Sequence, residues 1–207
     1  MMNDDGGGEN ETPAGRRRKQ RGPREYKPRE PRPIDAAQLQ DMAVGYAAKY
    51  ATTAAKLRRY LARKLGERVW TPETPPDIET LVSKIASLGY VDDRAYAASK
   101  ARDLTTRGFG ARRVRGALSA AGVSRDDVSA TIDADPDEDA AATALTTAIA
   151  FARRRRFGPF ARDGASTDPV RMRRELAAMA RAGHDFGVAR RVLGAGDEDA
   201  IDGLMDD

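Results

Sequence analysis

Apolar positions downstream of residue 36 recur at the spacing of amphipathic helices. The segment 77–90, DIETLVSKIASLGY, places aliphatic side chains at i, i+3, i+4 and i+7, which predicts a helix with one buried face. Gly89 predicts the end of that helix, and Asp92 or Asp93 predicts the start of the next. No stretch alternates apolar and polar residues between hairpin turns, so the sequence predicts an all-α protein.

A short pattern recurs three times along the chain. It consists of a base, an apolar residue, an Arg, two variable positions and a Leu, as in KLRRYLARKL, RVRGALSAAG and RMRRELAAMA. The apolar anchors are Leu57, Val114 and Met172, which lie 57 and 58 residues apart. A period this regular predicts duplicated units, and its length predicts about three helices in each. We therefore expect an elongated array of three tandem three-helix repeats.

Changes in composition divide the chain further. Residues 1–36 are rich in Gly, Pro, Arg and Glu and poor in aliphatic side chains, which predicts a disordered, basic tail. The three repeats are predicted over 37–74, 75–134 and 135–196, and an acidic C-terminal tail is predicted over 197–207.

The stretch LGYVDDRAYA joins two helical patterns of the second repeat. It combines a helix stop, a hydrophobic staple and a helix start, and variants recur as AAGVSRDDV and RAGHDFGVARRVL. The turn therefore sets the angle between consecutive short helices. The residues expected to fix the turns and helix ends of this repeat are Gly89, Tyr90, Asp92, Asp93, Tyr96, Gly108, Gly110 and Gly122.

Catalytic and metal-binding residues are scarce. The chain has no cysteine and one histidine, His184, so neither a zinc site rich in nitrogen and sulfur nor a histidine-based triad is complete. The carboxylate pairs at 92–93 and 126–127 fit helix starts better than metal sites. We expect no enzyme activity, no cofactor and no small-molecule substrate. No apolar run reaches the roughly 20 residues of a membrane span and no signal peptide is visible, so we expect a cytoplasmic protein.

Basic side chains are the most informative polar residues. The net charge is +4, and residues 16–32 hold nine Lys and Arg against two Glu. On helical wheels, further basic residues point outward beside the apolar stripes, and they predict a basic stripe facing an extended anion such as DNA. A single surface Arg is more often paired with a nearby carboxylate. The candidate contacts are Lys56, Arg59, Arg63, Arg112, Arg113, Arg171 and Arg174.

These segments resemble the RecX family of proteins that regulate the RecA recombinase. The resemblance covers residues 38–194 and is most specific over LGYVDDRAYA, RGFGARRVRGAL and AAGVS. It implies a curved array of three-helix repeats that docks in the groove of the RecA–DNA filament. It also implies that strand exchange, ATP hydrolysis and co-protease activity are modulated, usually downwards. The basic tail and the insertion FGPFARDGASTDP depart from the family pattern.

Three hypotheses follow for the function. The leading one is a regulator of RecA in DNA repair and the SOS response, which contacts the RecA filament and single- or double-stranded DNA without sequence preference. The second is a general DNA-binding protein with helix-turn-helix-like repeats, for which RecA is irrelevant. The third is a structural scaffold, which predicts no salt-dependent association with DNA.

Overall fold

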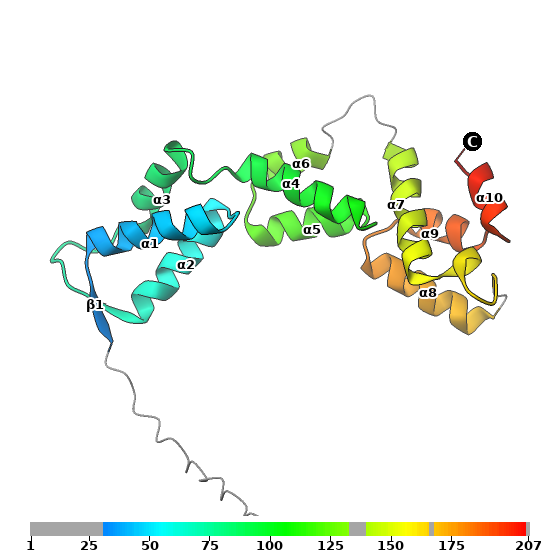
Figure 1. The fold of residues 1–207 in the computed structure, drawn as a ribbon, viewed down its shortest axis with the longest axis horizontal. Coiled ribbons are helices and arrows are strands. Elements are labelled where there is room, and N and C mark those ends of the chain that lie inside the picture. The colour runs from blue at the N-terminus through cyan, green and yellow to red at the C-terminus, as the bar shows by residue number, and fades with distance from the viewer. Residues whose placement is uncertain (1–30, 133–139, 166–167, 206–207) are drawn as a thin grey trace, which may run out of the picture. The chain divides into compact units, whose positions relative to one another are not determined.

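Helices make up nearly all of the regular structure. The computed structural model describes residues 31–132, 140–165 and 168–205, and within these ranges it holds ten α-helices, one short 3-10 helix and two three-residue strands (Figure 1). The predicted all-α fold class is confirmed. Residues 1–30 of the predicted tail and the segment 133–139, which spans the predicted boundary between the second and third repeats, lie outside the described residues.

Two short strands were not predicted from the sequence. β1 (Arg32–Ile34) and β2 (Arg68–Trp70) pair in parallel, with Ile34 opposite Trp70. Ile34 is fully buried, so the predicted tail over 1–36 extended too far into the folded chain. Strands of three residues cannot show a sustained alternation, and this pair joins segments separated by two whole helices. The sequence pattern therefore could not reveal them.

The first helical group comprises α1 (Ala36–Lys49), α2 (Ala54–Gly66) and α3 (Ile78–Ser87). These helices begin at the N-cap side chains of Asp35, Thr53 and Asp77, each of which accepts a hydrogen bond from a first-turn N–H. One core joins all three helices and β1, and its buried members are Ile34, Leu39, Ala43, Leu57, Leu61, Val82, Ile85 and Val91. The predicted boundary at residue 75 was wrong, because α3 packs on α1 and α2 rather than on the next group.

The second helical group comprises α4 (Asp93–Thr106), α5 (Ala111–Ala121) and α6 (Arg125–Ile132). Its separate core consists of Ala97, Leu104, Val114, Leu118, Ala121, Val123 and Val128. The apolar residues on α5 follow the i, i+4 spacing that the sequence pattern indicated, and α5 ends at a glycine in the left-handed region, Gly122.

The third helical group comprises α7 (Ala140–Arg155), η1 (Gly158–Phe160), α8 (Pro169–Arg181), α9 (Phe186–Leu193) and α10 (Glu198–Gly203). The core of this group includes Ile201 of α10, which is almost fully buried. The prediction of an acidic tail from residue 197 was therefore wrong, because one isoleucine secures an extra helix within that acidic stretch.

The third occurrence of the repeated pattern is out of register with the core. Leu57 and Val114 are buried, but Met172 is only half-buried, and the buried side chains of α8 are Glu175 and Met179. These two residues lie eight and four positions before the helix-ending Gly183, as Val114 and Leu118 lie before Gly122. The helices therefore correspond by their ends and not by their starts.

The first and second groups meet where the start of α2 lies against the end of α5. The Thr53 hydroxyl donates a hydrogen bond of 2.6 Å to the carbonyl oxygen of Ala121. The Asp93 carboxylate accepts one of 2.8 Å from the N–H of Ala54. A β-carbon on Gly122 would overlap the methyl group of Ala55. We call these contacts the α2–α5 joint.

The second and third groups meet in the corresponding way, where the start of α5 lies against the end of α8. The Gly110 N–H donates a hydrogen bond of 3.0 Å to the carbonyl oxygen of Ala182. A β-carbon on Gly110 would overlap the backbone of Gly183, and one on Gly183 would overlap the amide nitrogen of Arg113. Gly108 has the same constraint against the α7 backbone. We call these contacts the α5–α8 joint.

Candidate nucleic-acid interface

Two of the predicted basic contacts lie at the α2–α5 joint. Lys56 donates a hydrogen bond to the Tyr96 hydroxyl, and its ammonium lies 4.3 Å from the centre of that ring. Arg59 donates to the carbonyl oxygens of Ala120 and Ala121 at 3.2 and 3.4 Å. Both side chains therefore already have partners within the protein, and their helical phase alone could not show this.

Arg112 makes a similar contact at the α5–α8 joint, although it occupies a different position in its helix from that of Arg59. Its guanidinium donates a hydrogen bond of 2.9 Å to the carbonyl oxygen of Ala180, near the end of α8. A cation at a helix carboxyl end interacts favourably with the helix dipole and with the unpaired carbonyl groups there. Arg112 and Arg59 thus perform the same task at the two joints.

Arg171 is held inside the third group. It donates to Asp163 at 2.7 Å and to Glu175 at 2.9 Å, and the buried Glu175 also accepts from the N–H of Gly158 at 2.9 Å. The hydrogen bonds to Asp163 and Glu175 raise the pKa of the Arg171 guanidinium, and the bond from Arg171 lowers the pKa of Asp163. Removing one partner of a buried pair leaves an uncompensated charge. Arg171 is therefore part of the framework that holds η1 against α8.

Arg113 and Arg174 keep their guanidinium groups free. Both residues are exposed, and neither side chain forms a hydrogen bond, ion pair or ring contact within the part of the chain that the structure describes. Arg63 is also exposed, with its guanidinium 5.8 Å from the ring of Tyr60. Of the seven predicted contacts, these three have no polar partner in the described residues.

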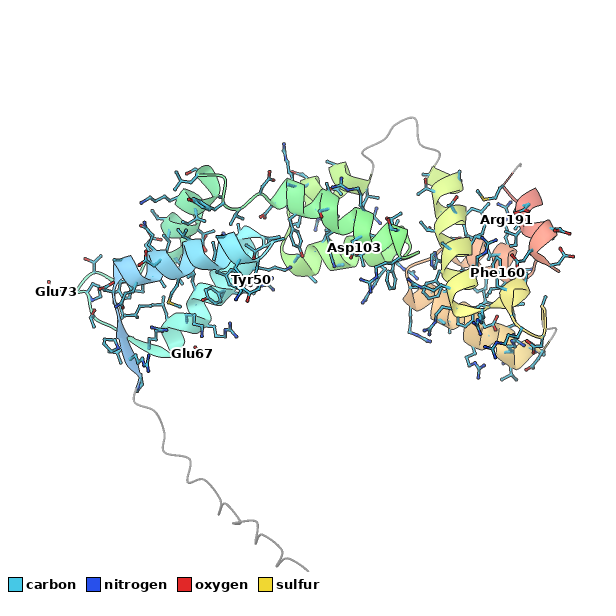
Figure 2. All side chains as sticks on the ribbon, in the orientation of Figure 1. Tyr50, Glu67, Glu73, Asp103, Phe160 and Arg191 are labelled. Carbon is cyan, nitrogen blue, oxygen red and sulfur yellow. The ribbon has the colours of Figure 1, made fainter. Side chains whose placement is uncertain are left out.

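The helices α5 and α8 carry further arginines beside the predicted contacts. The two helices together contain seven arginines and one glutamate, and that glutamate, Glu175, is already bound to Arg171. Nitrogen-tipped side chains gather at the start of α5 and along α8 in Figure 2. A surface with this excess of guanidinium groups attracts phosphates through charge and counterion release.

An arginine–phenylalanine cluster at the end of α7 lies outside the predicted site. The guanidinium of Arg153 lies 4.9 Å from the ring of Phe160 (labelled in Figure 2), and that of Arg154 lies 5.6 Å from Phe109. Arg107, at the end of α4, lies on the same Phe109 ring at 5.8 Å. The run FARRRRFGPF contains the signal, because it places a block of arginines between phenylalanines.

The predicted turn residues have distinct tasks in the structure. Gly89 has a positive φ of 80° and ends α3, and Asp92 caps α4 by accepting from the N–H of Ala95. The turn is predicted to contain a hydrophobic staple, and its buried apolar residue is Val91, directly before the N-cap Asp92, whereas Tyr90 is 48% exposed.

His184 is buried beside the α5–α8 joint. Its side chain is 3% exposed, and its ring lies 5.3 Å from that of Phe151. Burial lowers the pKa of its imidazole.

Among the described residues, no three His, Cys, Asp or Glu side chains gather as a metal site would require. The helices within the same ranges include none with the length and apolar character of a membrane span.

Comparison with known proteins places this geometry in context. Residues 92–132, which match α4–α6, fit the family model described as RecX, second three-helix domain. The regulatory protein RecX of Myxococcus xanthus is 34% identical over 182 residues, covering 82% of this chain and 91% of that protein. The regulatory protein RecX of Agrobacterium fabrum is 30% identical over 158 residues, covering 74% of this chain and 80% of that protein.

Two solved structures share the fold. A crystal structure of regulatory protein RecX aligns with a TM-score of 0.51 at 20% identity, covering 75% of this chain and 72% of that one. The structure of RecX from Lactobacillus salivarius aligns with a TM-score of 0.53 at 17% identity, covering 82% and 96%. At these identities the likeness concerns the fold alone.

Proposed function

The chain belongs to the RecX family, and from this membership we propose that it binds the filament of RecA on DNA and lowers its recombinase, ATPase and co-protease activity. One observation carries the proposal. The 34% identity extends over 91% of a protein named for a regulatory role, so the likeness includes the helical groups as a series and not a single DNA-binding unit.

The free arginines of α5 and α8 supply the contact with DNA. Arg113 and Arg174 have no partner among the described residues, and the two helices hold seven arginines against one glutamate. Neutralising backbone phosphates releases counterions and needs no particular base sequence. These arginines therefore suit DNA of any sequence held in a constant shape, which is the form that DNA has in a recombination filament.

The remaining helix faces contact RecA subunits in this mechanism. A protein that occupies the filament surface hinders the addition of subunits and the motions that accompany ATP turnover. Because the DNA contacts are electrostatic, inhibition weakens as salt screens the guanidinium groups; the screening length falls from about 10 Å at 0.1 M salt to about 3 Å at 1 M.

Charge reversal at the two free arginines tests the proposal. The Arg113→Glu, Arg174→Glu double variant should require roughly tenfold more protein to inhibit ATP hydrolysis by RecA on single-stranded DNA, with the larger deficit at low salt. Arg171 and Arg112 are left intact, because they hold the fold.

The control variant carries the same change of net charge elsewhere. Arg102 and Arg125 are exposed, lie outside the predicted set, and are reversed together to Glu. Inhibition by this control should match the wild-type protein at each salt concentration. Equal inhibition by both double variants would remove the arginines of α5 and α8 from the mechanism.

A general DNA-binding protein is the second candidate function. Arg112 and Arg113 in the first turn of α5 favour it, because DNA-binding helices often contact the duplex through their first turn. Measuring affinity for DNA with and without RecA separates the two functions. Equal affinity supports the second candidate, and tighter binding in the presence of RecA supports the first.

A further inference from the structure

Three tyrosines of the first helical group contact one another at its surface. Tyr46 and Tyr50 follow each other by one turn at the end of α1, and Tyr60 lies on α2. The rings of Tyr46 and Tyr60 stack with their centres 4.1 Å apart and an interplanar angle of 17°, and Tyr50 is tilted against Tyr46 at 5.1 Å. The three rings therefore form one continuous aromatic surface, which we call the tyrosine platform.

The platform is fixed on one side and open on the other. Tyr46 and Tyr60 are half-buried and pack against the core of the first group. Tyr50 follows the last residue of α1 and is 48% exposed (labelled in Figure 2). Two half-buried rings thus contact a third that is about half exposed, so a flat ligand can contact Tyr50 without displacing a core side chain.

Positive charge borders the rings. The Lys49 ammonium lies 5.4 Å from the centre of Tyr50, and the Arg63 guanidinium lies 5.8 Å from the centre of Tyr60. Both side chains are exposed, and neither forms an ion pair within the described residues. The helix α2 carries five Lys and Arg and no acidic residue, and two of these bases, Arg58 and Lys64, are paired with glutamates outside the helix.

Aromatic rings bordered by free cations match the chemistry of an unpaired nucleotide. A base presents a flat π-face to an aromatic side chain, and its phosphate presents a negative charge to a neighbouring cation. In a duplex the bases already stack on one another and offer no free face. The arrangement therefore selects single strands over duplexes without reading their sequence.

We propose that the tyrosine platform, with Lys49 and Arg63, is a base-stacking site for single-stranded DNA. A base stacks on Tyr50, and the flanking phosphates lie beside Lys49 and Arg63. This inference rests on the proposed contact with DNA and adds the form of DNA that the first helical group binds. It is independent of the arginines on α5 and α8.

Tyr90 provides a matched control for Tyr50. It is also 48% exposed and lies after α3 in the same part of the chain, but it has no ring or cation contact among the described residues. Replacing either residue by Ala removes the same side chain from a similarly exposed position. Only the Tyr50 change removes a member of the platform.

The test measures the affinity of the full-length protein for labelled oligothymidylate by fluorescence anisotropy. Tyr50→Ala should weaken binding roughly tenfold, whereas Tyr90→Ala should leave it unchanged. Tyr50→Trp, which keeps a larger aromatic face, should restore binding. An abasic oligomer of the same length, which keeps the phosphates but lacks bases, should bind the wild-type, Tyr50→Ala and Tyr90→Ala proteins equally.

Two results would overturn the base-stacking site. One is oligothymidylate affinity in Tyr50→Ala equal to wild type; the other is an equal loss on the abasic oligomer, which would assign the effect to phosphate contacts. Assaying RecA ATPase with the same proteins keeps the two proposals apart. Inhibition that persists without Tyr50-dependent binding counts against the platform alone, and Tyr50-dependent binding without any effect on RecA counts against the proposed function alone.

Discussion

The two joints between helical groups use equivalent parts of the fold and different chemistry. In each, the N-cap residue of one helix donates to the carbonyl of the alanine that precedes a helix-ending glycine. The donor at the α2–α5 joint is the side-chain hydroxyl of Thr53, and at the α5–α8 joint it is the backbone N–H of Gly110. The same acceptor position is thus reached by a side chain in one case and by the main chain in the other.

This difference sets how closely the groups approach. A threonine hydroxyl adds reach, so the α2–α5 joint closes through side chains, with Asp93 and Arg59 adding further hydrogen bonds. At the α5–α8 joint the N-cap Gly110 has no side chain, so the backbones touch there, and Gly110 and Gly183 lie where a β-carbon would overlap the facing backbone, while Arg112 adds one side-chain hydrogen bond. Both joints combine an arginine contact with a glycine in a close approach, but side-chain hydrogen bonds predominate at the α2–α5 joint and backbone contact predominates at the α5–α8 joint.

The largest predicted effect is that of Gly183→Ala at the α5–α8 joint. The new methyl group would overlap the Arg113 amide nitrogen, and the residue has a φ of 94°, which alanine rarely adopts. We expect the free energy of unfolding to fall by about 3 kcal/mol, from overpacking and backbone strain together. Urea denaturation followed by circular dichroism measures this loss.

Gly116→Ala is the control for that substitution. Gly116 lies within α5, and a methyl group added there would have open space around it, with nothing within 4 Å. Alanine at this position should stabilise the protein by about 1 kcal/mol through helix propensity. A Gly183→Ala protein that unfolds at the wild-type urea concentration would show that the backbones do not need to touch.

The next effect removes the hydroxyl group of the α2–α5 joint. Thr53→Val eliminates both the hydrogen bond to Ala121 and the N-cap of α2, and should lower the free energy of unfolding by about 2 kcal/mol. The neighbouring Thr52 is also buried, but its hydroxyl has no hydrogen-bond partner among the described residues. Thr52→Val should therefore be neutral or stabilising. Equal losses in the two variants, measured by urea denaturation, would contradict this explanation of the joint.

The smallest predicted effect is a dependence of the free energy of unfolding on pH. It concerns the α5–α8 joint and not the α2–α5 joint, because the sole histidine, His184, lies beside the former. Burial lowers its pKa in the folded protein below the usual 6.5. The unfolded chain therefore binds the proton more readily, and stability should fall as the pH drops through 6.5, until the folded pKa is reached. The slope should stay below about 1.4 kcal/mol per pH unit, the limit for one proton.

His184→Gln should remove this pH dependence. Unfolding free energies of both proteins, measured between about pH 7.5 and pH 5.5, provide the test, because no other side chain has an ordinary pKa in that interval. If the free energy of unfolding changed with pH equally in both proteins, the folded structure would not disfavour protonation of His184.

Local features of the fold were predictable from the sequence. The helix end was predicted at Gly89 and the next helix start at Asp92 or Asp93, and the structure has Gly89 after α3 and Asp92 as the N-cap of α4, because caps depend on residues within four positions of the helix boundary. The burial of Leu57 and Val114 followed from the helical period. In α8 the same reasoning selected Met172, because α8 extends further ahead of the shared helix end than α5 does.

The environments of the basic residues were much less predictable. Helical phase correctly placed Arg59 and Arg112 at the surface, yet their acceptors lie 61 and 68 residues further along the chain. Contacts of that separation depend on how one group meets the next, which no local pattern encodes. The tyrosine platform has the same origin, since Tyr46 and Tyr60 come together only when α1 folds back along α2.

The pairing of β1 with β2 determines where the chain can safely be shortened. A deletion designed on the predicted tail would end at residue 36 and would remove Ile34, whose side chain is wholly enclosed by the first helical group. It would also remove β1, so that Val69 and Trp70 of β2 would lose the strand with which they pair. A shortened protein that begins at Arg32 keeps the β1–β2 pair and Ile34. Any change in its binding or activity would then result from the loss of residues 1–31 and not from damage to the first helical group.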